Sequence, residues 1–212
     1  MLGGELRPEE YANKHLENFL LVQGRSPEQV HEARVELRKY AVIVQVTYPL
    51  HLNYDVIRIS KGILRRLGEV RDYDVHGCPK VPREELLDQV DREKVTLKRL
   101  PKLYGSRFLV MRNLIKIFME LDKVNDFHGL RKQIRTARIL GDSLNLPSEN
   151  LKEISRIMGE ERDRMNREVC NGLKPRHNVD LEDIREKARA SLREILLSNH
   201  EFRHVKGMLS QY

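Results

Sequence analysis

The sequence predicts an all-α protein made of two similar helical halves. The chain has 212 residues, which is enough to bury a substantial core. Its charged fraction of 33% indicates that much of each helix faces water, and the absence of Trp with only 12 Gly suits helices better than a turn-rich β protein. Two different motifs each occur twice, in the same order and at nearly the same spacing. We therefore predict an internal duplication.

The first half is divided into four predicted helices by start signals and breakers. Pro8 and the acids after it start the first helix, and Ser26 caps the second, with Gln29 completing a capping box. The four helices run from Pro8 to near Gly24, from Ser26 to Pro49, from Asp55 to about His76, and from near Glu84 past Lys98.

The second half also holds four predicted helices. They run from about Phe108 to Leu121, over His128 to Pro147, from Ser148 to Asn171, and from Leu181 to Met208, the last as one helix or a broken pair. No long linker separates the halves, which we place at about 8–104 and 105–212 within a single domain of residues 1–212. Two four-helix bundles packed about a pseudo-two-fold axis are the simplest architecture that fits.

The first repeated motif places one histidine and two arginines on a single helix face, because residues three, four and seven apart lie on the same side. It consists of His31, Arg34 and Arg38, and again of His128, Arg131 and Arg135, where 128−31, 131−34 and 135−38 all equal 97. Cations gathered in one stripe repel each other unless something negative lies among them. The motif therefore predicts a place where an anion is held.

The second repeated motif, Lys-x-x-x-Arg-x-x-Gly-Glu-x-Arg-Asp, lies in the third and the seventh predicted helix. It consists of Lys61, Arg65, Gly68, Arg71 and Asp72, and again, 152−61 = 91 residues further on, of Lys152, Arg156, Gly159, Arg162 and Asp163. Glycine inside a helix costs roughly 1 kcal/mol against alanine, so we expect another helix or a ligand to approach it closely. The alternative is ordinary packing with solvated ion pairs one turn apart, as at Arg65–Glu69 and Arg156–Glu160.

Metal binding, cofactors and catalysis are not predicted. Cations beside each histidine would repel a metal ion, and Val35 stands where a zincin motif starting at His31 would have its second histidine. The chain has neither a phosphate-binding glycine loop nor a nucleophile elbow. Asp72 and Asp163 each adjoin an arginine, so we interpret them as groups that orient guanidinium rather than as general bases. For His31 and His128, a buried and hydrogen-bonded core role remains the alternative to ligand binding.

Composition favours a polyanionic partner, since the formal net charge is +7. Aromatic residues make up 6% and none recurs at matching places in the cationic stripes, which favours recognition by charge alone over stacking on nucleic-acid bases. Cys78 and Cys170 are expected to be free thiols in a reducing compartment. The N-terminus lacks a signal-peptide pattern, and the most apolar stretch, Tyr40 to Leu50, is too short to span a bilayer, so we expect no membrane contact and a cytoplasmic location.

The His-x-x-Arg-x-x-x-Arg stripe, followed by Leu-Gly-Glu-Val-Arg-Asp-Tyr-Asp-Val at 67–75, resembles the CHAD family, the conserved histidine α-helical domain. The resemblance covers nearly the whole chain from about residue 8 and is weaker in the second half, where Arg164-Met165 follows the second Arg-Asp. It implies two similar helical bundles around a basic central channel that binds inorganic polyphosphate and can place the protein on polyphosphate granules. It implies ligand roles for His31, Arg34, Arg38, Arg71, His128, Arg131, Arg135 and Arg162.

The predicted site is completed by cations from or beside the two motifs, namely Lys39, Lys61, Arg65, Lys132, Arg138, Lys152 and Arg156. The leading hypothesis is a non-enzymatic module that binds inorganic polyphosphate or another polyanion. The alternatives are a helical protein that binds nucleic acid and, third, a metal-dependent phosphoanhydride hydrolase in which Asp or Glu holds the metal.

Overall fold

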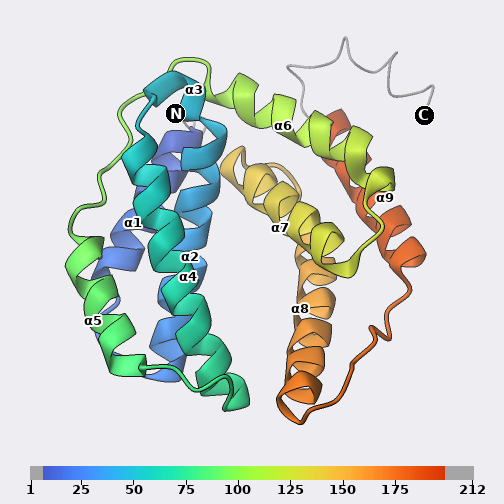
Figure 1. Cartoon of the computed structure of the whole chain (residues 1–212). Coiled ribbons are helices and arrows are strands. Elements are labelled where there is room, and N and C mark those ends of the chain that lie inside the picture. The colour runs from blue at the N-terminus through green and yellow to red at the C-terminus, as the bar shows by residue number, and fades with distance from the viewer. Residues whose placement is uncertain (1–6, 199–212) are drawn as a thin grey trace.

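The computed structural model describes residues 7–198, and every regular element within that range is a helix (Figure 1). The all-α prediction is therefore confirmed for these residues. None of the described helices combines the length and the hydrophobicity that crossing a membrane requires.

The first half of the chain forms one group of helices, drawn in blue to green on the left of Figure 1. Its elements are α1 (Pro8–Leu21), α2 (Pro27–Val46), the single turn α3 (Tyr48–His51), α4 (Tyr54–His76) and α5 (Arg83–Lys94). α1 packs on α2, α2 on α4, and α4 on α5. The predicted capping box is present, since the Ser26 hydroxyl accepts from the Gln29 N–H at 3.3 Å and the Gln29 side chain accepts from the Ser26 N–H at 3.0 Å.

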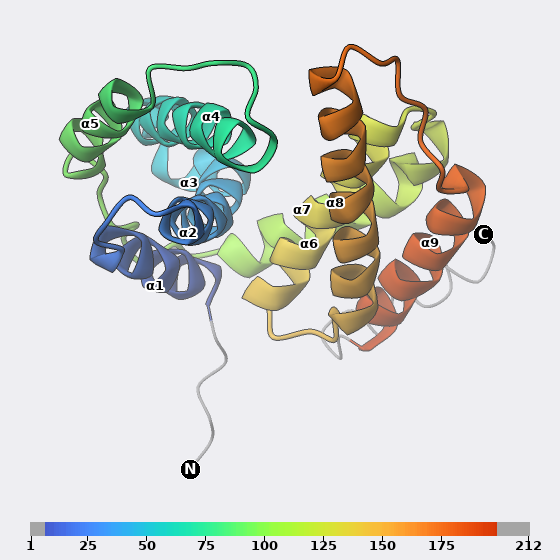
Figure 2. The same ribbon diagram turned by 90° about the horizontal axis from the view of Figure 1, so that it is seen from below.

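The second half forms another group, which lies beside the first in both views (Figures 1 and 2). Its elements are α6 (Ser106–Glu120), the 3₁₀ turn η1 (Leu121–Lys123), α7 (Phe127–Ser143), α8 (Glu149–Cys170) and α9 (Leu181–Ser198). α6 packs on α7 and α9, and α8 packs on α7 and α9. α8 follows Ser148 as predicted, although the Ser148 hydroxyl binds Asp142 instead of capping the helix. The predicted extension of the last helix to Met208 lies outside the described residues.

The fourth predicted helix is shorter than expected, because α5 ends at Lys94 and does not continue past Lys98. The backbone that follows α5 forms hydrogen bonds with a side chain of α1 instead of continuing the hydrogen bonding of a helix. The Asn13 amide donates to the Leu100 carbonyl at 2.9 Å, and its oxygen accepts from the Leu100 N–H at 2.7 Å. Leu100 and Leu103 are buried against the core. Tertiary hydrogen bonds and burial therefore replace helical bonding in this segment.

The two groups of helices meet where α1 and α2 lie against α6 and α7, with the most extensive contact between α2 and α7, and α4 also contacts α8. α7 lies next to α2 in Figures 1 and 2. The buried apolar residues form one continuous core, in which Leu37 of α2 and Leu130 and Ile134 of α7 are completely buried. Because α2 and α7 carry the two histidine–arginine stripes, their contact brings the stripes of the two halves together.

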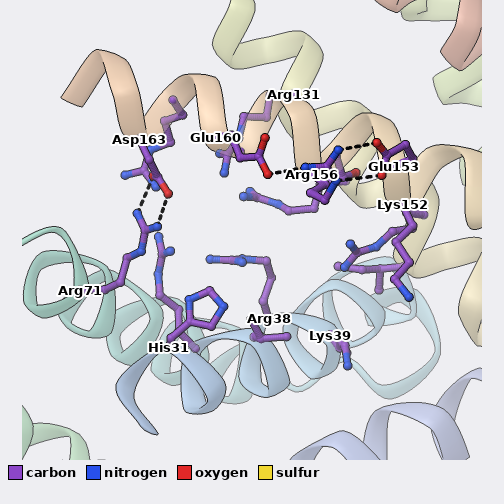
Figure 3. Close-up of a pocket in the computed structure, with 18 of the residues that line it drawn as sticks. His31, Arg38, Lys39, Arg71, Arg131, Lys152, Glu153, Arg156, Glu160 and Asp163 are labelled. Atoms are coloured by element: carbon purple, nitrogen blue, oxygen red, sulfur yellow. Dashed lines mark hydrogen bonds and ion pairs between the residues drawn. The ribbon is translucent and has the colours of Figure 1, made fainter. Parts of the chain in front are cut away.

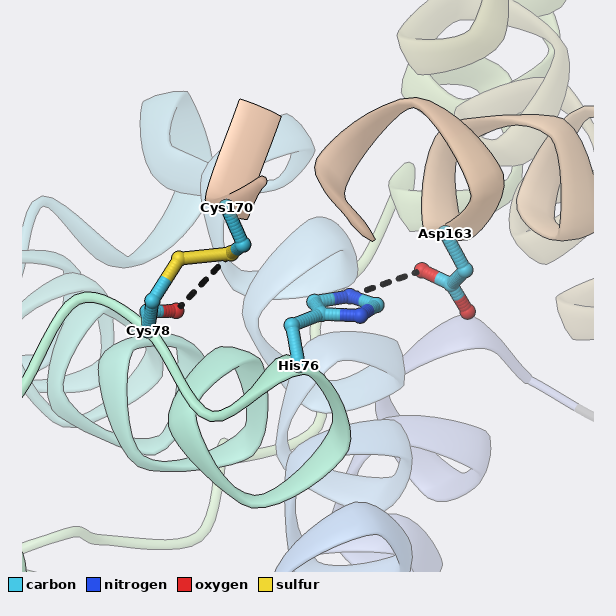
Figure 4. Close-up of a disulfide and its surroundings, with 4 residues drawn as sticks. All are labelled: His76, Cys78, Asp163 and Cys170. Atoms are coloured by element: carbon cyan, nitrogen blue, oxygen red, sulfur yellow. Dashed lines mark hydrogen bonds and ion pairs between the residues drawn. A yellow bond between two sulfur atoms is a disulfide. The ribbon is translucent and has the colours of Figure 1, made fainter. Parts of the chain in front are cut away.

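The prediction of free thiols is wrong, because Cys78 and Cys170 form a disulfide (Figure 4). The bond joins the segment just after α4 to the last residue of α8, across a sequence separation of 92 residues. Cys78 follows Asp72 by 78−72 = 6 residues, and Cys170 follows the matching Asp163 by 170−163 = 7, so each cysteine lies near the C-terminal end of a helix that carries the second motif. Folding brings these ends together. The argument for a reducing compartment that rested on free thiols is thereby removed.

Candidate anion-binding site

Four arginines at the contact of α2 and α7 form the centre of the site, and we call them the inner arginines: Arg34, Arg38, Arg131 and Arg135. All four are half-buried. Among the described residues, none of the four forms an ion pair or a hydrogen bond, and the Nε atoms of Arg34 and Arg131 are buried without a partner. Burying a charge without a counter-ion is costly. This arrangement therefore leaves positive charge for a ligand to neutralise.

Burial and mutual repulsion both act on the inner arginines. Burial lowers the pKa of Arg34, Arg131 and Arg135 to about 10. Burial also lowers the pKa of Arg38 well below its ordinary value, and repulsion by Arg34 and Arg135 adds to the effect. A guanidinium with a pKa near 10 is still charged at neutral pH, so Arg34, Arg131 and Arg135 hold like charges together at this contact. An anion placed among them would remove an unfavourable interaction that the protein maintains when it is empty.

A glycine makes room for one of these arginines, as its position inside a helix led us to expect. A Cβ atom added to Gly68 of α4 would lie 3.3 Å from Nη2 of Arg34 and 3.5 Å from its Nε. Gly159, at the matching position of α8, differs, because a Cβ atom there would meet nothing within 4 Å. Gly159 lines a cavity instead. The two glycines therefore share a sequence motif but not a structural role.

This difference gives a paired prediction. Gly159→Ala should raise the melting temperature, because alanine is favoured inside a helix by about 0.5–1 kcal/mol and its methyl group has free space. Gly68→Ala should displace the Arg34 guanidinium and weaken polyanion binding by up to about tenfold. Thermal denaturation and a polyphosphate titration of both variants check the prediction. Equal effects of the two changes on binding would mean that Gly68 does not position Arg34.

The first of two cavities beside the inner arginines, the α8-side cavity, has a volume of about 520 Å³ and lies between α2, α7 and α8 (Figure 3). It brings together eleven predicted site residues, namely His31, Arg34, Arg38, Lys39, Arg71, Arg131, Arg135, Arg138, Lys152, Arg156 and Arg162. The predicted ligand-binding residues did not include the four acids that also line it, which are Glu149, Glu153, Glu160 and Asp163. Cations outnumber acids, and the acids all belong to α8.

The second, the α4-side cavity, has a volume of about 960 Å³ and lies between α2, α4, α6 and α7. Its predicted site residues are Arg34, Arg38, Lys61, Arg65, His128, Lys132 and Arg135. Among the described residues, Glu120 is the one acid that lines it. Lys116 of α6 also lines this cavity and was missed, because α6 carries neither repeated motif. Three inner arginines line both cavities, so the cavities lie on either side of the contact between α2 and α7.

The cations at the rims are partly neutralised, unlike the inner arginines. Arg65 is 72% exposed and lies 3.9 Å from Glu69, and Arg156 is held between Glu153 and Glu160. The alternative of solvated pairs one turn apart is therefore correct for these two arginines. Arg65 and Arg156 therefore offer less unneutralised charge to an anion than the inner arginines do.

Two crossed ion pairs, which we call the clasp, join α4 to α8 at one end of the α8-side cavity. Both nitrogens of the Arg71 fork donate to the Asp163 carboxylate, one of them at 2.8 Å, and Arg162 donates to Asp72 at 2.6 Å. Each pair joins an arginine of one helix to the aspartate of the other. The hydrogen bond to Asp163 raises the pKa of Arg71 above its ordinary value. Both aspartates therefore bind guanidinium, in line with the role that we assigned to them.

The two repeated histidines lie at the rims of different cavities, His31 at the α8-side cavity and His128 at the α4-side cavity. Both are exposed, so the alternative of buried core histidines is wrong. Burial of its ring lowers the pKa of His31, repulsion by Arg71, Arg34 and Arg38 lowers it further, and Asp163 opposes these effects. His31 is therefore neutral over more of the pH range than an isolated histidine.

Comparisons with family models, curated proteins and solved structures gave no match to the chain. The resemblance to the CHAD family therefore rests on the motifs described above. Among the described residues, no group of three or more His, Cys, Asp and Glu side chains is arranged to hold a metal ion.

Proposed function

We propose that this protein is a non-enzymatic, CHAD-like module that binds inorganic polyphosphate. The observation that carries the proposal is the set of inner arginines, which are half-buried, crowded and without carboxylate partners among the described residues. Polyphosphate carries about one negative charge per phosphate, and guanidinium binds phosphate oxygens through two parallel hydrogen bonds. A chain of phosphates would supply the counter-charge that the fold leaves out.

The internal duplication and the central channel belong to this proposal. The clasp supports the duplication, since it pairs Arg71 with Asp163 and Arg162 with Asp72, which are matching positions of one motif. The cavities support the duplication too, because residues at matching positions of the two motifs line different cavities. The α8-side cavity has His31, Lys152 and Arg156, and the α4-side cavity has their counterparts His128, Lys61 and Arg65. A pseudo-two-fold axis through the contact of α2 and α7 accounts for both observations, and the shared arginines would join the cavities into one basic channel.

Polyphosphate explains the site better than nucleic acid does. Proteins that bind single strands without sequence preference usually stack bases on aromatic side chains. No Phe or Tyr is among the described residues that line either cavity. The cavities offer guanidinium, ammonium and imidazole groups, which suit a ligand without bases. A cytoplasmic location, on polyphosphate granules, follows from this function as part of the proposal.

Competition tests this function. Long-chain polyphosphate should displace a labelled single-stranded oligonucleotide from the protein, whereas the oligonucleotide should displace polyphosphate poorly. The affinity for polyphosphate should fall steeply with salt, because binding releases counter-ions. Tighter binding of the oligonucleotide would instead identify a nucleic-acid-binding protein. Phosphate release from polyphosphate, measured with and without magnesium, should stay at background, and magnesium-dependent release would identify a hydrolase.

Polyphosphate affinity should rise as the pH falls through the titration range of His31. The neighbouring cations and partial burial lower the pKa of His31 in the empty protein, and a bound polyanion would raise it, so binding takes up protons. The affinity for polyphosphate is then highest at a pH below the lowered pKa of His31 in the empty protein. The affinity declines as the pH rises through the pKa of His31 in the bound protein. Titrations across this range check the prediction.

Histidine variants provide the control. His31→Gln with His128→Gln should flatten the pH profile while preserving the fold and most of the affinity at high pH. An unchanged profile in this variant would mean that the arginines and lysines alone hold the anion.

A further inference from the structure

The disulfide lies directly beyond the clasp, on the same two segments of chain. Cys78 and Cys170 each follow a member of the Arg71–Asp163 pair by seven residues, about two helical turns. His76 fills the space between, with a side chain that is 1% exposed and an Nε2 atom 3.9 Å from Oδ1 of Asp163 (Figure 4). His76 therefore lies between the disulfide and the ion pair that lines the cavity.

The disulfide opposes a repulsion that the site itself creates. The α8-side cavity is lined by cations of α2 and α4 on one side, such as Arg38, and by cations of α7 and α8 on the other, such as Arg131. Without an anion these two sets repel each other, and the repulsion acts to separate the halves of the chain. Near the C-terminal ends of α4 and α8, the clasp and the disulfide hold the two halves together. Salt weakens the ion pairs of the clasp but does not weaken the covalent disulfide.

The disulfide is accessible to small reagents. Both cysteines are partly exposed, and Gly77, Pro79 and Val169 beside them are exposed. The disulfide lies outside the continuous apolar core. Its reduction therefore leaves the packing inside each group of helices intact.

We propose that the Cys78–Cys170 disulfide is a modification site for a dithiol reductant, and that its redox state sets the affinity of the α8-side cavity for polyphosphate. This inference rests on the proposed function. The oxidised form holds the two cationic walls at a fixed spacing before the ligand arrives, so binding does not have to draw them together. The reduced form lets the walls separate at the clasp end, which lowers the affinity and speeds release.

The chemistry is ordinary thiol–disulfide exchange. A thiolate of the dithiol attacks one sulfur, forms a mixed disulfide and releases the other cysteine, which takes up a proton. The second thiol of the reductant then attacks the mixed disulfide and releases the second cysteine, which is also protonated. Two electrons and two protons pass to the protein, and the reductant leaves as its own disulfide.

The test measures binding of labelled polyphosphate to the full chain, oxidised and after reduction with dithiothreitol. Reduction should weaken binding by about tenfold, within the range usual for coupling between two sites, and reoxidation should restore it. The variant Cys78→Ser with Cys170→Ser should bind like the reduced protein and should not respond to dithiothreitol. Circular dichroism of each form should show the same helix content.

Each other outcome is decisive. Equal affinity of the two redox forms would overturn the inference and leave the proposed function standing. Loss of helix on reduction, together with loss of binding, would also overturn it, because the bond would then be structural. Absence of binding in both forms would refute the proposed function, and the inference would fall with it.

Discussion

Replacing Arg34 and Arg135 by glutamate should abolish polyphosphate binding without lowering the melting temperature. These two guanidiniums line both cavities, and neither has a carboxylate partner among the described residues. Each substitution removes a phosphate ligand and places a negative charge where the phosphate chain would lie. It also relieves repulsion with the remaining inner arginines, so stability should be unchanged or higher. Calorimetric titration with polyphosphate and thermal denaturation measure the two effects.

The matched control reverses two arginines that line neither cavity. Arg92 of α5 and Arg193 of α9 are exposed, and their replacement by glutamate changes the net charge by the same amount. Arg189 is less suitable, because it pairs with Asp122 and its guanidinium lies over the ring of Phe118. The control should retain most of the affinity. Comparable losses in the two variants would show that a diffuse surface charge, and not the site, holds the anion.

Replacing the two aspartates of the clasp should lower the melting temperature and tighten polyphosphate binding. The double change Asp72→Asn and Asp163→Asn removes the carboxylates that pair with Arg162 and Arg71. The side chains of the two aspartates are 24% and 25% exposed. Losing a hydrogen bond to a charged group costs about 1.5–3 kcal/mol, so the melting temperature should fall by several degrees. The freed guanidiniums then add two phosphate contacts, which should tighten binding at low salt and steepen its salt dependence.

The exposed pairs around Arg156 are the control for the clasp. Glu153→Gln with Glu160→Gln changes the net charge by the same amount, but pairs this exposed contribute about 0–1 kcal/mol. The melting temperature should therefore fall less than in the clasp variant. If the clasp variant binds polyphosphate more weakly than the unmodified protein, the aspartates position the arginines for the ligand instead of competing with it.

The helices were predictable from the sequence because their determinants are local. Caps and breakers such as Ser26 act within a few residues, and the periodicity of the stripes on α2 and α7 places their arginines on one face. The end of α5 was not predictable, because Asn13 binds the backbone of Leu100 across a separation of 87 residues. A tertiary hydrogen bond of this kind leaves no mark on the local sequence.

Most of the residues of the site could be predicted from the sequence, but which of them are paired with acids could not. Repetition identified most of the cations that line the cavities but missed Lys116, and it could not show that some of them, such as Arg65, also pair with an acid of their own helix. A signal for the disulfide was present, since Cys78 and Cys170 lie near the C-terminal ends of the two helices that carry the second motif, 78−72 = 6 residues after Asp72 and 170−163 = 7 residues after Asp163. The pairing was not predicted because the positions of the cysteines were not compared with those of the repeated motif.

The most direct test of the account is the position of phosphate in a crystal of the protein grown with polyphosphate. The account predicts phosphate oxygens within hydrogen-bonding distance of the inner arginines, in a chain of phosphates that continues from the α8-side cavity into the α4-side cavity past Arg34, Arg38 and Arg135. Phosphate bound solely to exposed residues outside both cavities, such as Lys98 and Lys102, would contradict it.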